Sequence, residues 1–497
     1  MATLLHPMRT SFGQTSAPIF STSSFAKWQI SSNIYAFHQP VRHAHSRRNV
    51  SYTAAEMEGS ERIASSALID MTKPVPPLSI LPLPNLIRSY LITAISSFPT
   101  LLYASLRALR FLANSKSAAL NPDRNPLLHS LIKRTIYAQF CAGETTHEVD
   151  ETINRLKRMG YRGVMLGYAR EVCLGKNQAE ILSSKVKEDG LNVDEISSWT
   201  KGTLTTVGMA QKGDFVSVKF TGAGTQALQH LAMGKPPSTL LEKSITEVCE
   251  LAETRGVKLL FDAEQDAVQA GIDAWTIGCM KRYNRNGQAL VYGTYQAYKK
   301  STPGVLAEHL DLARKEDFVL GVKLVRGAYL GCDPRHLFWE TIEDTHQTYD
   351  GIAESLMRRA YNDTLKATSP SAGAFPRVNL VLAGHNKDSV IRAQAIRNAQ
   401  AASGESRIDL AYGQLMGMAE DVSCGLVHAG QVAVQEGGES VVDVPRAYQY
   451  LVWGTVGECS QYLVRRAEEN KDALSRTREG RKALGKELLR RCGMPWR

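Results

Sequence analysis

The sequence predicts an α/β protein built as a distorted (βα)8 TIM-like barrel with an N-terminal helical arm. From about residue 130, strand-like segments alternate with helix-like segments, which is the pattern of βα units around a parallel sheet. Eight such strands spread over about 350 residues fit the usual size of a (βα)8 barrel. Polar residues follow most of the strands, at the end of a barrel where active sites collect.

One repeating unit shows the alternation at the level of residues. Ser238 can cap a helix whose apolar residues keep a helical period, Gly256 ends that helix, and residues 257–261 (VKLLF) begin a strand. The other strand segments are residues 163–166, 215–220, 290–292, 318–325, 378–382, 408–412 and 446–451.

A doubly wound open sheet is the alternative architecture. It would normally carry a glycine-rich phosphate-binding loop between its first strand and the next helix. Residues 163–167 (GVMLG) lack the G-x-G-x-x-G spacing and do not stand at a helix start. The sequence therefore favours the barrel, a fold that hosts many different chemistries.

Residues 1–55 have the composition of a mitochondrial transit peptide. They are rich in Ser, Thr and Ala and hold five basic residues, and the first acidic residue of the chain is Glu56. A disordered N-terminus without a targeting role is the alternative.

Residues 56–128 are expected to form a proline-rich linker and the helical arm. Five prolines between residues 74 and 84 favour an extended chain because they lack amide donors. Residues 89–106 then form an uncharged run, but Pro99 and six Ser or Thr residues make this run a poor membrane span. We expect the arm to pack on the main domain, and attachment to a membrane surface is the alternative.

The net charge of +10 is concentrated at the two ends of the chain. Residues 1–55 hold five basic and no acidic residues, and residues 471–497 hold nine basic and three acidic residues, so the remainder is close to neutral. No nucleic-acid-binding surface is indicated for the body of the protein. We expect a catalytic domain over residues 129–475 and a basic tail over 476–497. A protein that binds RNA or anionic lipid through its basic ends is the non-catalytic alternative.

The eight cysteines stand singly along the chain, without any C-x-x-C pair or histidines at zinc-finger spacing. This spacing is typical of reduced thiols, and it indicates neither a disulfide framework nor a structural metal site.

The segment 462–470 (YLVRRAEEN) has the most informative spacing in the chain. Four of its polar residues fall at i, i+3, i+4 and i+7 of a helix: Tyr462, Arg465, Arg466 and Glu469. Arg binds carboxylates bidentately, and two adjacent Arg side chains repel each other unless an anion lies nearby. This helix face suits a small carboxylate ligand, although taken alone it could be a solvated charged face.

Polar residues at the strand ends supply the context. They are Lys219, Asp262, Gln296, Lys323, Arg326, His385 and Gln414. A single residue of this kind could cap a helix or form a structural ion pair. A ring of them at a barrel mouth needs hydrogen-bonding or charged partners, such as a bound polar ligand or cofactor. Lysines on two strands, Lys219 and Lys323, also leave a Schiff-base aldolase open.

Several segments together resemble the proline dehydrogenase family, flavin enzymes that begin proline catabolism to glutamate, and the long N-terminal extension looks like that of fungal members. The segments agree with the family in order and spacing from about residue 130 to about residue 475. They are residues 135–144 (TIYAQFCAGE), 216–220 (VSVKF), 261–265 (FDAEQ), 295–298 (YQAY), 322–330 (VKLVRGAYL), 384–386 (GHN), 414–418 (QLMGM) and 462–470 (YLVRRAEEN).

The resemblance implies a barrel that holds non-covalent FAD at its mouth, with the helix of residues 462–469 over the flavin. The implied substrate-site residues are Lys219, Asp262, Tyr450, Tyr462, Arg465 and Arg466, together with Glu171 as an acidic partner of the two arginines. The implied flavin contacts are Gln296, Lys323, Val325, Gly327, Ala328, Tyr329, His385, Leu415 and Glu469. Lys323 departs from the Arg of many bacterial members, yet it keeps the positive charge that can tune a flavin.

The implied reaction is hydride transfer from C5 of L-proline to flavin N5, which yields Δ1-pyrroline-5-carboxylate. The resemblance further implies ubiquinone as electron acceptor and a location on the matrix side of the inner mitochondrial membrane. Related hydroxyproline-oxidising enzymes carry a smaller residue at the position of Tyr450, so this tyrosine favours proline as substrate.

Overall fold

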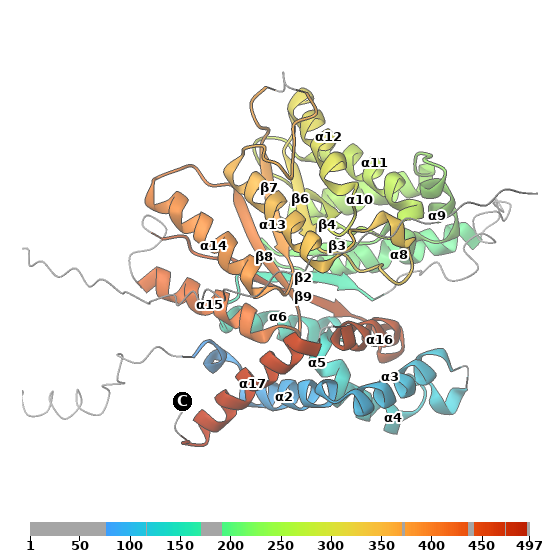
Figure 1. The fold of residues 1–497 in the computed structure, drawn as a ribbon. Helices are drawn as coiled ribbons and strands as arrows, with labels where there is room; N and C mark the ends of the chain where they lie inside the picture. The colour runs from blue at the N-terminus through green and yellow to red at the C-terminus, as the bar shows by residue number, and fades with distance from the viewer. Residues whose placement is uncertain are drawn as a thin grey trace, which may run out of the picture. The chain divides into compact units, whose positions relative to one another are not determined.

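Eight parallel strands close into a barrel at the centre of the protein (Figure 1). The structure is a computed structural model that describes residues 76–169, 191–369, 373–435 and 442–494, apart from residues 116 and 473. The barrel strands are β2 (Gly163–Tyr168), β3 (Phe215–Val218), β4 (Lys258–Phe261), β5 (Val291–Gln296), β6 (Leu320–Val325), β7 (Val378–Ala383), β8 (Asp409–Leu415) and β9 (Ala447–Trp453). Each strand pairs with the next one in the chain, and β9 pairs with β2 to close the ring. The predicted barrel and all eight predicted strands are confirmed.

A ninth strand, β1 (Cys141–Gly143), was not predicted. It pairs in parallel with the carboxyl end of β9, where Cys141 lies opposite Val452. Three residues are too few to show the alternation that identifies a strand in a sequence.

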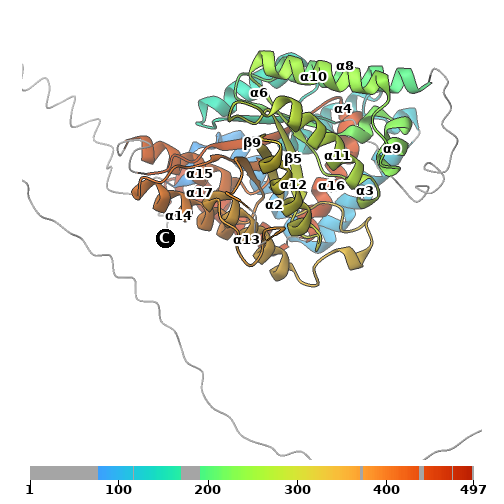
Figure 2. The same cartoon turned by 90° about the horizontal axis from the view of Figure 1, so that it is seen from above.

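Helices follow the strands and flank the barrel (Figure 2). They are α8 (Leu191–Met209), α9 (Thr225–Ala232), α10 (Thr239–Arg255), α11 (Asp266–Tyr283), α12 (Thr302–Lys315), α13 (Ile342–Arg358), α14 (Lys387–Ala402), α15 (Glu420–Gln435) and α16 (Val456–Asp472). Short 3-10 turns lie at η4 (Phe220–Ala223) and η5 (Arg335–Leu337). As predicted, Ser238 occupies the N-cap position of α10, although its side chain makes no capping hydrogen bond, and Gly256 ends the helix with φ +65°.

The inside of the barrel is apolar at its amino end and polar at its carboxyl end. A buried cluster fills the amino end and consists of Met165, Phe215, Leu260, Ala289, Tyr292, Val319, Val381, Ala411 and Tyr448. Side chains alternate along a strand, so Phe215, Ser217 and Lys219 point to the barrel interior while Val216 and Val218 pack against the outer helices. On the inward face of such a strand, the polar residues therefore lie nearer the carboxyl end of the barrel than the apolar residues.

The chain before the barrel forms the predicted helical arm. Its elements are η1 (Pro77–Ile80), α2 (Leu83–Ser97), α3 (Pro99–Asn114), η2 (Ala118–Leu120), α4 (Pro126–Ile132), the π-helical turn η3 (Lys133–Tyr137), α5 (Ala138–Phe140) and, after β1, α6 (Thr146–Arg158). Helix α3 packs on α16, and α2 packs on α17 (Leu474–Arg491), which overlaps the segment expected as a basic tail. Among the described helices, none is long and apolar enough by itself to cross a membrane.

Seven cysteines are described, and all seven are free thiols. The described residues contain no group of three or more side chains that could hold a metal ion.

Candidate active site

A buried carboxylate, Asp262, stands at the centre of the barrel mouth directly after β4. Its Oδ1 atom lies 2.7 Å from Lys323 Nζ, and its Oδ2 atom lies 3.8 Å from Lys219 Nζ. The Ser217 hydroxyl donates a hydrogen bond of 2.6 Å to Oδ2. Side chains from the ends of β3 and β6 therefore converge on the carboxylate that follows β4.

Burial raises the pKa of Asp262, but the positive charges of Lys323 and Lys219 and the hydrogen bonds from Lys323 and Ser217 outweigh burial and lower the pKa below its usual value. The carboxylate is ionised at neutral pH. The site thus holds two cations around one anion, which leaves a net positive charge suited to an anionic ligand.

Tyr450, on β9, covers one side of this charge cluster. Its hydroxyl lies 3.0 Å from Ser217 Oγ and 3.4 Å from Asp262 Oδ2. Lys323 Nζ lies 5.3 Å from the centroid of the Tyr450 ring, within cation–π range. The aromatic ring is thereby held in a defined orientation at the mouth.

Ser217 was missed by sequence reasoning. It is the one polar residue inside the strand Phe215–Val218, and it shares the inward face with Lys219. A hydroxyl on the inward face of an otherwise apolar strand is the signal that could have identified it.

The expected flavin-contact residues on β5 and β6 form a second polar group. Gln296 donates to the carbonyl of Glu264 at 3.3 Å and accepts a hydrogen bond of 3.0 Å from the Tyr298 hydroxyl. The same hydroxyl accepts the backbone N–H of Tyr329 at 3.1 Å. This chain of bonds holds the loop after β6 against the end of β5.

That loop carries three more of the expected flavin contacts. Val325 ends β6, and Gly327 has φ +137°, a conformation in which a side chain would also collide with the Tyr298 ring. Ala328 follows, and the Tyr329 hydroxyl lies 3.5 Å from Lys219 Nζ, so this loop reaches the Asp262 cluster. The missing side chain of Gly327 lets the backbone of this loop pack directly on the Tyr298 ring.

His385 and Leu415 join the ends of β7 and β8. The Leu415 N–H donates to His385 Nε2 at 3.1 Å, so Nε2 carries no proton in this arrangement. Arg326 points away from this cluster, because it donates to His346 and Ser389 and stacks on the ring of Tyr349.

Helix α16 brings the predicted arginine face to the same end of the barrel. Tyr462 and Arg466 are both buried, and the Arg466 guanidinium carbon lies 4.8 Å from the centroid of the Tyr462 ring. Tyr462 belongs to an apolar cluster that Leu415 and Tyr450 adjoin. Arg465 is partly exposed beside them. The structure therefore brings together the helix face and the strand ends.

Two of the expected residues cannot be compared with this geometry. Glu171 lies in the segment after β2, outside the described residues, and Glu469 lies on α16 but its side chain is not described.

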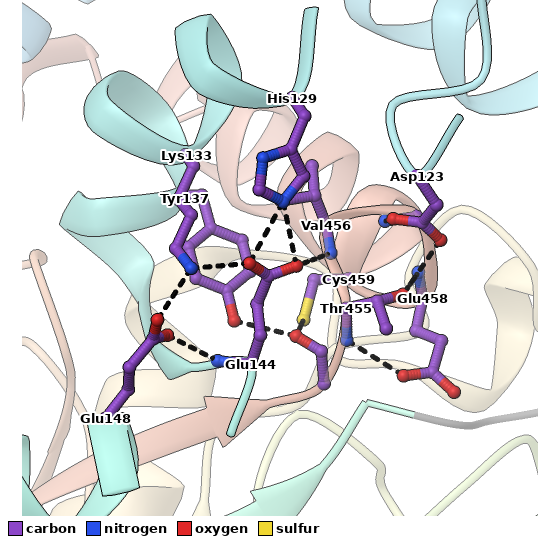
Figure 3. A network of polar contacts seen from close by, with 12 residues as sticks. Asp123, His129, Lys133, Tyr137, Glu144, Glu148, Thr455, Val456, Glu458 and Cys459 are labelled. Carbon is purple, nitrogen blue, oxygen red and sulfur yellow. Dashed lines mark hydrogen bonds and ion pairs between the residues drawn. The ribbon is translucent and has the colours of Figure 1, made fainter. Parts of the chain in front are cut away.

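The first turn of α16 is held by a network of polar contacts from the arm (Figure 3). Glu144 accepts the Val456 N–H at 3.1 Å and pairs with Lys133 at 2.6 Å and with His129 at 3.0 Å. Burial raises the pKa of Glu144, but its hydrogen bonds from Lys133, His129 and the Val456 N–H outweigh burial and lower it. A carboxylate at a helix N-terminus is stabilising because it complements the helix dipole.

Two further carboxylates fix the same helix end. Asp123 accepts the Gly457 N–H at 2.8 Å, and Thr455 and Glu458 form reciprocal hydrogen bonds of 2.9 Å and 3.1 Å that make a capping box. Residues that precede the barrel, Asp123 and Glu144, therefore hold the first turn of the helix that carries Tyr462 and Arg466 (Figure 3).

Comparison with known proteins gives a consistent result. A family profile described as Proline dehydrogenase matches residues 149–479. A probable mitochondrial proline dehydrogenase of Schizosaccharomyces pombe is 27% identical over 411 residues, which cover 73% of this chain and 81% of the relative. A hydroxyproline dehydrogenase of Xenopus laevis is 28% identical over 431 residues, which cover 81% of this chain and 86% of that relative.

Among solved structures, proline utilization A from Bdellovibrio bacteriovorus, inactivated by N-propargylglycine, superimposes with a TM-score of 0.55 at 15% identity. The match covers 84% of this chain and 41% of that one. At this identity the likeness supports the barrel fold.

Proposed function

Because the chain belongs to the proline dehydrogenase family, we propose that it oxidises L-proline to Δ1-pyrroline-5-carboxylate with FAD bound at the barrel mouth. The observation that carries the proposal is the convergence of Asp262, Lys323 and Tyr450 at the strand ends beside the arginine-bearing face of α16. When bound, FAD supplies the hydride acceptor at its N5 atom.

The side chains at the mouth fit a flavin. Lys323 provides a buried positive charge that can donate a hydrogen bond to an electron-rich ring atom, and Gln296 offers a buried amide at the end of the neighbouring strand β5. Gly327 lets the loop after β6 pack on the Tyr298 ring, and the Tyr298 hydroxyl accepts the Tyr329 N–H in the same loop. In the proposed site these residues bind the cofactor, together with Val325, Ala328, Tyr329, His385, Leu415 and Glu469.

The substrate is oriented by the residues of α16 and β9. Arg465 and Arg466 bind the proline carboxylate, because guanidinium groups match a carboxylate bidentately. Tyr450 and Tyr462 form walls around the pyrrolidine ring and limit its orientation, which lowers the entropic cost of reaching the reactive geometry. Proline must present a neutral nitrogen for hydride loss, and Lys219 and Asp262 set the electrostatic potential in which this occurs.

A Schiff-base aldolase fits the geometry less well. Its lysine must present a free amine, whereas both candidate lysines pair with the Asp262 carboxylate, Lys323 Nζ at 2.7 Å and Lys219 Nζ at 3.8 Å. Several relatives are named hydroxyproline dehydrogenases, so the choice between the two ring substrates has to be made at the site. Tyr450 occupies space beside the ring and favours proline.

The electron acceptor we propose is ubiquinone, and the location is the matrix side of the inner mitochondrial membrane. The relatives from Schizosaccharomyces pombe, Dictyostelium discoideum and Caenorhabditis elegans are named mitochondrial, which supports the organelle. Residues 1–55 act as the targeting segment in this proposal.

Anaerobic mixing of the purified protein with L-proline tests the proposal in one step. We expect a yellow protein whose flavin absorption bleaches on addition of L-proline. A colourless protein, or a flavin spectrum that L-proline leaves unchanged, would contradict the proposal.

A further inference from the structure

Stripes of apolar side chains cover the outer surface of the arm helices. On α2, four aliphatic residues follow one another at i+4 spacing, each between 42% and 55% exposed: Leu83, Ile87, Leu91 and Ile95. On α3, Tyr103 and Phe111 are 60% and 64% exposed, and on α4, Leu127 is 83% exposed. The opposite faces carry buried residues such as Leu86, Leu102 and Leu106. Such apolar patches on a protein surface mark a site that another surface covers.

The chain around these stripes carries a net positive charge. Residues 76–137 hold seven Lys or Arg and a single acidic residue, and residues 474–494, in and around α17, hold seven basic and two acidic residues. Two of the basic residues pair with acidic residues outside these ranges, Arg110 with Glu468 and Lys133 with Glu144 and Glu148. The intervening residues 138–473 hold 37 basic and 42 acidic residues. The net positive charge of the described residues therefore lies in the arm helices, which carry the apolar stripes, and in α17, which packs on α2.

Basic side chains stand directly beside the apolar ones. Arg107 lies at i+4 from Tyr103 and at i−4 from Phe111, so the three share one exposed stripe of α3. Arg124 and Arg134 are exposed on either side of α4. Aromatic and aliphatic residues interleaved with Arg on one helix face are typical of a surface that lies in the interface of an anionic bilayer.

The same layer supports the proposed substrate helix. Helix α3 packs on α16, and Arg110 pairs with Glu468 of α16. Leu109 and Leu112 adjoin the apolar cluster that contains Tyr462. Figure 1 places α2, α3 and α4 on the side of α16 that faces away from the barrel.

We propose that the exposed face of α2, α3 and α4 docks on the surface of an anionic phospholipid bilayer without crossing it. The pair α2 and α3 has the combined length and composition of a span, but the two helices meet at an angle of 104°. The apolar stripes enter the boundary of the bilayer while Arg107, Arg124 and Arg134 contact lipid phosphates. A second copy of the chain fits this face poorly, because it would bring two basic surfaces together.

Docking does not require the catalytic reaction, but the biological reason for docking rests on the proposed function. A protein held by this layer carries α16 close to the membrane, where a lipid-soluble quinone resides.

Vesicle sedimentation of the full-length protein tests the proposal. The probes are vesicles of phosphatidylcholine alone and of phosphatidylcholine with phosphatidylglycerol. We expect the protein to sediment with the anionic vesicles, and the triple variant Leu91→Ser, Tyr103→Ser and Phe111→Ser to bind them at least ~10-fold more weakly. A matched control changes two residues of the barrel helices that are exposed to a similar degree, Ile342→Ser and Ile391→Ser, and should bind as the original protein does.

Two further readouts make the result decisive. Arg107→Glu should weaken binding to anionic vesicles while leaving the weak binding to neutral vesicles unchanged. Equal sedimentation of the triple variant and the control would overturn the proposal. Self-association through the apolar face would also overturn it, if the original protein forms a dimer that the triple variant converts to a monomer and neither binds vesicles.

Reduction of a water-soluble dye by L-proline separates this proposal from the proposed function. Dye reduction should be equal in the original protein, the triple variant and the control. If none of them reduces the dye while the difference in vesicle binding persists, the proposed function fails and the docking surface stands.

Discussion

Lys323 Nζ lies 2.7 Å from Asp262 Oδ1, and both side chains are buried at the mouth of the barrel. The two residues lie at the ends of β6 and β4, on either side of β5. Solvent screens a buried ion pair poorly, so removing one partner leaves the other as an uncompensated buried charge. Loss of either charge would therefore destabilise the barrel mouth and also change the net charge that a ligand meets there.

Replacing Lys323 by Met should lower the free energy of unfolding by about 3 kcal/mol, because Asp262 then loses its nearest cation inside the protein. Urea denaturation measures the loss. The double variant Lys323→Met and Asp262→Leu should recover part of it, since neither charge then remains unpaired. Lys315→Met, which removes an exposed partner of Asp311, is the control and should leave stability nearly unchanged, because solvent screens an exposed ion pair. A loss in the double variant equal to the sum of the two single losses would show that the pair is not coupled.

Arg465→Met and Arg466→Met should each raise the KM for L-proline on the order of 100-fold while FAD stays bound, because each removes one hydrogen-bonded charge from the substrate carboxylate. Steady-state kinetics and flavin absorption provide the two measurements. Arg478→Met, at an exposed position of α17, is the control and should leave KM unchanged. An unchanged KM in both site variants would remove the arginines from the carboxylate site.

Tyr450→Ser should increase the turnover of 4-hydroxyproline relative to L-proline, since the smaller side chain makes room for the ring hydroxyl. Tyr450→Phe should leave this preference for proline intact, because it keeps the ring and removes the hydroxyl that contacts Ser217 and Asp262. The ratio of kcat/KM for the two substrates is the measurement. Equal turnover of both substrates by the unchanged protein would contradict the role given to Tyr450.

Glu144→Gln should lower the free energy of unfolding by about 1 to 2 kcal/mol and raise the KM for L-proline, because the charged anchor of the first turn of α16 is lost. Thermal unfolding and proline kinetics measure the two effects. Glu151→Gln, at an exposed position of α6, provides the comparison. If Glu144→Gln destabilises the protein without changing KM, the network stabilises the fold but does not position the substrate helix.

Glu420, the first residue of α15, should make stability depend on pH near neutrality. Burial raises the pKa of Glu420 to about 7, although the charge of Arg88 opposes this shift. The folded protein therefore keeps a proton that the unfolded chain releases above about pH 4.3, so the stabilising contribution of this residue is lost as pH rises toward 7. Glu420→Gln should raise the free energy of unfolding at pH 8 by roughly 1 to 3 kcal/mol, and the difference should vanish below about pH 4. A difference that stays constant from pH 4 to pH 8, or one that Glu247→Gln reproduces, would contradict this assignment.

The alternation of apolar residues was sufficient to predict the barrel. Period-two strands and period-3.6 helices are local properties, and the eight strands appear where the alternation predicted them. The convergence of Lys219, Asp262 and Lys323 also follows from the sequence once the barrel is assumed, because parallel strands place their carboxyl ends together. The helical spacing of residues 462–466 brought Tyr462 and Arg466 onto one face for the same local reason.

Contacts between residues far apart in the chain were decided only by the tertiary structure. The Ser217 hydroxyl on Asp262 depends on the register of β3 against β4, and the Glu144 carboxylate on Val456 joins residues separated by 312 positions. β1 and the packing of α17 on α2 have the same origin. A local pattern encodes which face of an element is apolar, but not which distant polar group will lie opposite it. The sequence by itself therefore determined the barrel and the types of side chain at its mouth. Contacts between distant residues, which form only in the folded chain, decided how α16 is held over that mouth.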